Sequence, residues 1–154
     1  MNVFKTAARS RIIFVALLTA MIILGGCSGV KYIYDPGTSF SGLKSYAWTS
    51  ASGLGRQQSL VAANIQFVGD QVLGQKGFKK TSENPDLLIS IDPDYEISTF
   101  NDGYQLRSLT LNIYRRESKE PIWRGTAPGY INTHADSNDL NNAVRDVLAK
   151  FPPK

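Results

Sequence analysis

The spacing of hydrophobic residues predicts two amphipathic helices in this chain. Between residues 59 and 74, Val61, Ile65, Val68 and Val72 recur at intervals of four, three and four residues. That interval places all four on one face of a helix. A second stripe of the same kind, beginning after Asp136 or Ser137 and stopping at Pro152-Pro153, comprises Leu140, Val144, Val147 and Phe151. Each helix therefore has one face suited to covering a core.

Five stretches rich in β-branched and aromatic residues predict strands. They are residues 30–34, 40–48, 86–91, 106–116 and 122–127. The clearest is 106–116, where Leu109, Leu111 and Ile113 share one side and polar residues alternate on the other. Asp92-Pro93-Asp94 either ends the third strand or marks it as an edge. We expect polar loops or turns at 49–55, 79–85, 99–103 and 128–136.

The predicted order is strand, strand, helix, three strands, helix. This order predicts an α+β fold, a two-layer sandwich in which both helices pack on one face of a mostly antiparallel sheet of about five strands. The short turn at 117–121 favours an antiparallel hairpin. The first helix would then make one right-handed crossover to a parallel neighbour.

The first 26 residues differ from the rest of the chain. Lys5, Arg9 and Arg11 precede an almost wholly apolar run, 12–24, and no acidic residue occurs there. The run is shorter than the roughly 20 apolar residues that span a bilayer. A basic start, a short apolar run and small residues at its end are typical of a secretory signal peptide. The alternative interpretation is an uncleaved membrane anchor.

The end of this leader holds the only cysteine in the chain. Leu24-Gly25-Gly26-Cys27 resembles the bacterial lipobox, whose cysteine becomes the lipid-modified N-terminus. The resemblance implies that the Cys27 thiol carries a diacylglyceryl group and that its new amine is acylated. Several acyl chains anchor a protein stably, whereas one does not. Ser28 stands where aspartate can mark inner-membrane retention, so the resemblance also implies the outer membrane, facing the periplasm.

Cleavage would divide the chain into a signal peptide (1–26), a lipidated cysteine with a short tether (27–30) and a single domain (31–154). The 154 residues less these 26 leave 128, enough for one domain with a core. The leader holds three of the 17 basic residues, so 14 remain against 13 acidic ones. A net charge of about +1 gives no basis for nucleic-acid binding. With Cys27 alkylated, neither a disulfide nor a thiolate site is possible.

Several short stretches together resemble a family of bacterial lipoproteins known as domain of unknown function 4136. They are Tyr34-Asp35-Pro36, Lys44-Ser45-Tyr46-Ala47-Trp48, Lys76-Gly77-Phe78, Pro85-Asp86-Leu87-Leu88-Ile89, Ile122-Trp123-Arg124-Gly125-Thr126-Ala127 and the C-terminal Phe151-Pro152-Pro153. The resemblance covers nearly all of the mature chain. It implies a fold and a location, but no catalytic residue.

Two groups of residues are candidates for chemical sites. Asp92, Asp94 and Glu96 alternate, which would place three carboxylates on one side of a strand as calcium ligands, but Pro93 intervenes and calcium needs six to eight oxygens. Charges that protect a strand edge are the preferred interpretation. His134 is the only histidine, and no nucleophile motif accompanies it. We therefore predict no catalytic residue, no metal and no cofactor, and a hydrolase centred on His134 is the least favoured alternative.

The sheet face opposite the helices is the predicted interaction surface. Tyr114 should point outward from the clearest strand, and Tyr46, Trp48 and Arg124 are candidates to join it. Aromatic and arginine side chains are enriched in interfaces. The competing interpretation places Trp48 and Trp123 in the core. We expect a non-enzymatic binding or scaffolding domain with an envelope protein as partner, held to the membrane by its lipid. The alternative is a small-ligand or lipid-binding domain with a groove between helices and sheet.

Overall fold

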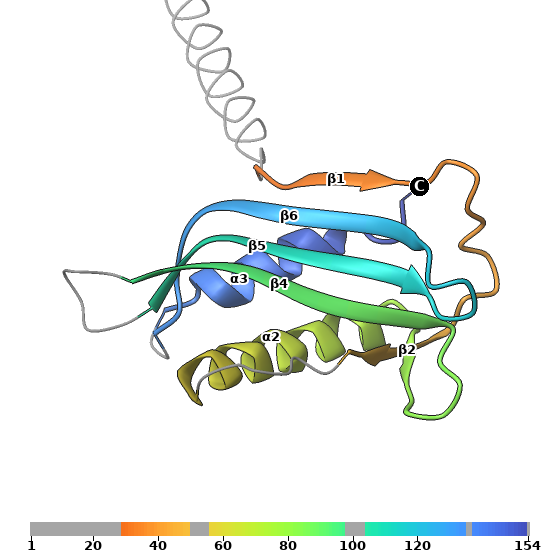
Figure 1. Cartoon of the computed structure of the whole chain (residues 1–154), viewed down its shortest axis with the longest axis horizontal. Coiled ribbons are helices and arrows are strands. Elements are labelled where there is room, and N and C mark those ends of the chain that lie inside the picture. The colour runs from red at the N-terminus through yellow and green to blue at the C-terminus, as the bar shows by residue number, and fades with distance from the viewer. Residues whose placement is uncertain (1–28, 50–55, 98–103, 135–136, 154) are drawn as a thin grey trace, which may run out of the picture.

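The computed structural model describes residues 29–49, 56–97, 104–134 and 137–153. The elements in order are β1 (Lys31–Tyr34), β2 (Ser45–Trp48), α2 (Arg56–Gln75), β3 (Lys79–Lys80), β4 (Leu87–Ile97), β5 (Tyr104–Arg115), β6 (Pro121–Asn132) and α3 (Asp139–Ala149). Both helices lie on the same side of the sheet (Figure 1). The predicted α+β class and the two helices are therefore confirmed.

The sheet is mixed and has six strands in the order β1-β6-β5-β4-β2-β3. The pairs β1-β6, β6-β5 and β5-β4 are antiparallel, while β2 is parallel to both of its neighbours, β4 and β3. The prediction of about five mostly antiparallel strands was therefore approximate. The strand it lacked, β3, has only two residues, both lysines, and no hydrophobic pattern. The predicted crossover through the first helix is present, because α2 joins β2 to its parallel neighbours.

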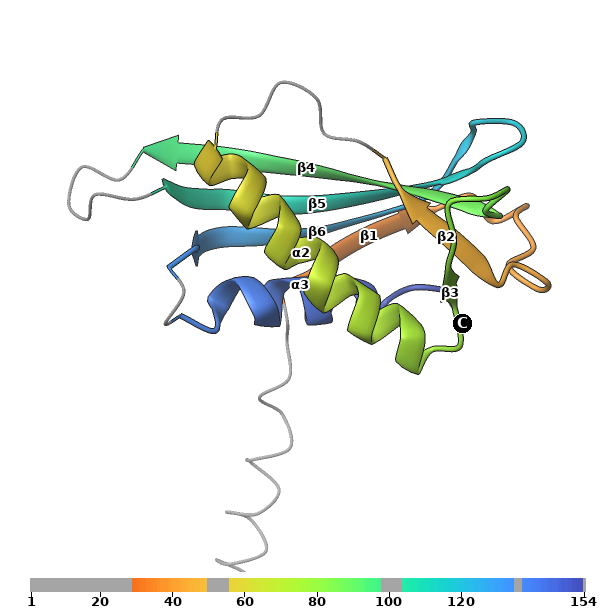
Figure 2. The same ribbon diagram turned by 90° about the horizontal axis from the view of Figure 1, so that it is seen from below.

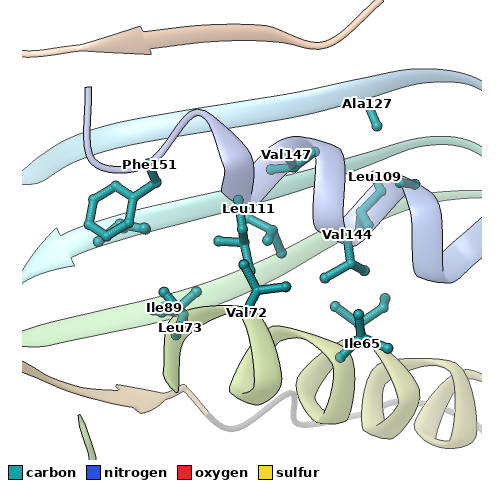
Figure 3. Packing of buried hydrophobic residues seen from close by; sticks show 14 of the residues in the cluster. Ile65, Val72, Leu73, Ile89, Leu109, Leu111, Ala127, Val144, Val147 and Phe151 are labelled. Atoms are coloured by element: carbon teal, nitrogen blue, oxygen red, sulfur yellow. The ribbon is translucent and has the colours of Figure 1, made fainter. Parts of the chain in front are cut away.

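The core fills the space between the helices and the sheet. α2 and α3 lie next to each other across the sheet (Figure 2). Leu109 and Leu111 of β5 face Val144 and Val147 of α3, and Ile65 approaches from α2 (Figure 3). All five side chains are fully buried. The predicted stripes of both helices therefore form the core.

Trp123 and Phe151 close one end of this core. Both are at most 1% exposed, and their ring centroids are 5.3 Å apart. Gly125, two residues along β6, leaves the room that the indole occupies, because a Cβ there would collide with the Trp123 ring. The competing interpretation of Trp123 as a core residue is thus confirmed. The slot also explains a glycine inside a strand, where glycine is otherwise unfavourable.

Several strand boundaries differ from the prediction. β6 continues to Asn132, so the first five residues of the predicted loop at 128–136 are strand, paired with the start of β5. β4 continues through Pro93 to Ile97 instead of ending at 91. Of the residues of β4, only Leu87, Leu88 and Ile89 pair with β2 in the described part of the chain. The rest of β4 is therefore an edge, where proline is tolerated. The second predicted strand, 40–48, is a strand only from Ser45 onward, because the stretch before it turns at Gly42 with φ +89°. The predicted turn at 99–103 lies outside the described residues.

Candidate functional site

The four residues predicted to form an interaction surface lie on two different faces. Tyr114 pairs with Leu88, and Arg124 pairs with Asn112, on the face away from the helices, hereafter the outer face. Tyr46 pairs with Leu87, which is fully buried, so Tyr46 and Trp48 face the helices instead. The placement of Tyr46 and Trp48 on the outer face was therefore wrong.

A polar network occupies the middle of the outer face. Arg124 Nε donates a hydrogen bond of 2.6 Å to Asn112 Oδ1, and Asn112 Nδ2 donates one of 3.4 Å to Ser90 Oγ. The hydroxyls of Thr110 and Thr126 lie 2.8 Å apart beside it. Asn112 is only 5% exposed. The two buried polar side chains of this network, Thr110 and Asn112, thus each have a partner, as burial requires, and the bond from Nε orients the otherwise exposed Arg124 side chain.

A shallow pocket of about 370 Å³ lies next to this network, where β1 meets β6. Its lining is largely apolar and comes from 33–35 and 121–124. Ile33 pairs with Arg124 across the two strands, so an apolar and a cationic side chain stand side by side on the outer face. The outer face therefore offers an arginine, a tyrosine and an apolar recess.

Tyr46 and Trp48 converge on one carboxylate of α2. The Tyr46 hydroxyl and the Trp48 Nε1 each donate a hydrogen bond of 2.8 Å to Asp70 Oδ1, and Lys80 Nζ lies 2.9 Å from Asp70 Oδ2. Gly69 makes the approach possible, because a Cβ there would lie 2.7 Å from the indole. The two aromatic rings meet edge to face at 6.2 Å. Sequence reasoning missed this site; its only signal was a Gly-Asp pair inside a helical pattern.

The charge states of this cluster follow from its bonds. Burial by itself raises the pKa of the Asp70 carboxyl, but hydrogen bonds from its three donors and the Lys80 charge outweigh burial, so the pKa lies below its ordinary value. Burial, and then the bond to Asp70, raise the pKa of the Tyr46 hydroxyl. The arrangement ties α2 to β2 and β3.

Asp86 performs a similar task at the start of β4. Its Oδ2 accepts hydrogen bonds from the backbone N–H groups of Lys44 and Ser45, both 2.9 Å, and from the Ser45 hydroxyl at 2.7 Å. The Ser45 hydroxyl in turn accepts one from the Asp86 N–H at 3.0 Å. The bond from Lys44 is the chief cause that lowers the pKa of Asp86. This reciprocal pairing fixes the parallel register of β2 against β4.

His134 lies exposed at the rim of a second pocket, of about 360 Å³, between α2 and α3. Ser137, three residues along the chain, accepts a hydrogen bond of 3.1 Å from the Asp139 N–H at the start of α3. Ser137 therefore has a role at the helix start, and no described hydrogen bond joins it to the imidazole. The predicted alternative was a groove between the helices and the sheet, but buried side chains fill that space.

Asp92, Asp94 and Glu96 lie along the unpaired edge of β4. Asp92 and Asp94 are exposed on the outer face, and Arg107 Nε lies 3.3 Å from Glu96 Oε2. Within the described ranges, no three histidine, cysteine or acidic side chains are grouped so as to hold a metal ion. Charged residues along an open edge oppose pairing with another chain.

The lipobox residues Leu24, Gly25, Gly26 and Cys27 lie outside the described residues. Among the helices that are described, none is long and apolar enough to cross a membrane. The domain begins directly after them, since β1 starts at Lys31.

Two solved structures share the fold. The first, a PDZ domain protein from Parabacteroides distasonis, has a TM-score of 0.56 and 16% identity; the match covers 81% of this chain but only 35% of that protein. The second, a PelC dodecamer from Paraburkholderia phytofirmans, has a TM-score of 0.53 and 12% identity over 78% of this chain and 93% of that one. At such identities the likeness concerns the fold alone.

A minor lipoprotein from Acinetobacter baumannii matches more distantly, with a TM-score of 0.40 and 13% identity over 70% of this chain and 88% of that one. No curated protein sequence matches the chain. The family model for domain of unknown function DUF4136 matches residues 30–153, which is nearly the whole described domain. The chain therefore belongs to the DUF4136 family.

Proposed function

We propose that this chain is the precursor of a lipid-anchored lipoprotein of the bacterial cell envelope. The signal peptide 1–26 would be removed, and Cys27 would carry the lipid in the outer membrane, facing the periplasm. The support is the basic and apolar leader that ends in Leu24-Gly25-Gly26-Cys27. The domain that follows is a non-enzymatic binding module for another protein of the envelope.

The outer face of the sheet is the observation that carries this proposal. Both helices cover the other face, so the outer face of the described domain has no layer over it (Figure 1). It displays Tyr114 and Arg124, and tyrosine and arginine are among the residue types enriched at the centres of interfaces. Arg124 is already held by Asn112, so binding would lose little side-chain entropy. An oriented arginine and a tyrosine on an uncovered sheet face fit a protein partner.

Photo-crosslinking in intact cells tests this proposal. A photoreactive phenylalanine analogue replaces Tyr114, because the aromatic ring is kept and the position is only partly exposed. We expect a discrete adduct whose mass identifies the partner. Since the PelC structure is a dodecamer, a second copy of this chain is one outcome that the adduct mass distinguishes from a different protein.

The matched control carries the same analogue at Phe67, an aromatic residue on α2 that is 63% exposed. An adduct at position 114 and none at 67 supports the proposal. An Arg124→Glu substitution should abolish the adduct, because it reverses the charge in the middle of the surface. Absence of any adduct at 114, or an adduct that Arg124→Glu leaves intact, would overturn the assignment of this surface.

A further inference from the structure

β1 forms one edge of the sheet and exposes three large apolar side chains in succession. Tyr32, Ile33 and Tyr34 are 43%, 67% and 40% exposed. β1 pairs with β6 on one side, and no other described strand lies on its other side (Figure 1). Three consecutive apolar residues at an open edge are unusual, since edges are normally protected by charge or proline.

The apolar residues flank the edge on both sides. Ile33 pairs with Arg124 and so points to the outer face, while Tyr32 and Tyr34 point to the helix side, with ring centroids 6.3 Å apart. The strand therefore presents an apolar ridge along its length. A flat surface that meets the sheet edge-on would contact all three side chains at once.

The position of β1 in the sequence restricts what that surface can be. Lys31, its first residue, is four residues after Cys27. Four extended residues span at most about 14 Å. A lipid on Cys27 would therefore hold β1 within that distance of the headgroups at all times. Every other described element follows β1 along the chain and is therefore separated from Cys27 by more residues.

The side chains of β1 suit the water–lipid boundary. Tyrosine is enriched there because its ring is apolar and its hydroxyl remains hydrated. Lys31 lies exposed at the start of the strand. Its cation would be drawn to anionic headgroups. The free backbone groups of the edge require water or headgroup partners, so the contact cannot extend into the hydrocarbon.

We propose that the β1 edge, through Tyr32, Ile33 and Tyr34, is the surface by which the domain rests on a phospholipid bilayer. This inference rests on the proposed lipid at Cys27. It fixes the orientation of the domain, because a sheet that stands edge-on leaves its outer face accessible to a partner in the periplasm. The depth would be limited to the headgroup and acyl boundary, roughly 5–10 Å.

The exposed apolar residues of α2 provide a matched comparison. Leu60 and Phe67 are 64% and 63% exposed, almost as much as Ile33. No short tether joins them to Cys27, and α2 lies on the side of the sheet away from the outer face. If exposure alone decided membrane contact, Phe67 would behave as Ile33 does.

Site-specific fluorescence tests the inference on the full lipidated protein. Cys27 is the only cysteine and its thiol is consumed by the lipid, so Ile33→Cys introduces a single reactive thiol. The label is an environment-sensitive dye, and the protein is reconstituted into vesicles of phosphatidylethanolamine and phosphatidylglycerol with brominated acyl chains. We expect a blue shift and quenching at position 33, and neither at position 67 in Phe67→Cys.

The outcomes separate this inference from the proposed function. Protein that fails to float with the vesicles would contradict the lipid anchor, and this inference with it. Protein that floats but shows no quenching at 33, or equal quenching at 33 and 67, would leave the anchor intact and overturn the β1 contact. Shielding of the dye from aqueous iodide without quenching by the brominated chains would assign β1 to a protein interface instead. A second label at Tyr32→Cys, on the other side of the edge, should repeat the result at 33.

Discussion

Gly69 and Gly74 lie five residues apart in α2, and only the first contacts another element. A Cβ at Gly69 would lie 2.7 Å from Cζ2 and 2.9 Å from Cη2 of Trp48, whereas a Cβ at Gly74 would have nothing within 4 Å. The same change, glycine to alanine, therefore tests the contact between α2 and β2 against a control in the same helix.

The two substitutions should change the free energy of unfolding in opposite directions. Alanine in place of a helical glycine stabilises by up to about 1 kcal/mol, which is the whole effect expected for Gly74→Ala. Gly69→Ala has the same gain, but it displaces the indole and strains its hydrogen bond to Asp70. Overpacking of this kind typically costs about 1–3 kcal/mol. We therefore expect Gly69→Ala to be less stable than Gly74→Ala by about that amount.

Urea-induced unfolding, followed by tryptophan fluorescence, measures the free energy of unfolding of each variant. A double-mutant cycle with Trp48→Phe isolates the contact. In the Trp48→Phe background the ring atoms that clash are absent, so Gly69→Ala should become neutral or stabilising. If Gly69→Ala is as stable as Gly74→Ala with Trp48 present, the packing of Trp48 on α2 described above is incorrect.

Three further changes test other contacts. Gly125→Ala should destabilise by roughly 1–3 kcal/mol in the same assay, because its Cβ would enter the space of the Trp123 ring; unchanged stability would refute that slot. Asp70→Asn removes a carboxylate whose pKa is lowered in the folded state, so the stability it contributes is present above its ordinary pKa of 3.8 and lost as the pH falls below it. The difference in free energy of unfolding between wild type and variant should therefore shrink in acid, and a difference that stays constant with pH would contradict the assignment. Asp86→Ala leaves three donors around Ser45 without their acceptor and should cost about 1–3 kcal/mol, with Asp86→Asn less severe.

The hydrophobic pattern was sufficient to predict the core of this fold. The stripes of both helices, and Leu109, Leu111 and Ile113 of β5, are buried as predicted, because their periodicity admits only one face toward a core. The same alternation predicted β5 itself, whereas its pairing with β4 and β6 extends beyond the predicted ends of both strands. These features depend on residues close together in sequence.

The faces of β2 could not be predicted in this way. Tyr46, Ala47 and Trp48 show no alternation of polar and apolar residues, so either phase was acceptable. The phase is set by Asp70 and Gly69, which lie in another element and supply an acceptor and a slot for the two aromatic rings. Interactions between residues distant in sequence leave no periodic signal.

The burial of polar residues on the outer face could not be predicted from the sequence either. Asn112 belongs to the polar side of the 106–116 alternation and lies on the outer face, but it is 5% exposed because the Arg124 side chain and neighbouring strands surround it. Strand β3 was missed for a related reason, since two lysines pair with β2 through their backbone alone. Side-chain pattern carries no information about such pairing.

The central claim is that Cys27 carries a lipid that holds the domain at the membrane. The most direct test is the mass of the protein extracted from membranes, measured beside a Cys27→Ser variant. The account predicts that the wild type lacks residues 1–26, carries the added mass of a diacylglyceryl group and an acyl chain, and fractionates with the membrane, whereas Cys27→Ser has no added mass. A wild-type protein that is unmodified at Cys27 and absent from the membrane fraction would contradict the account.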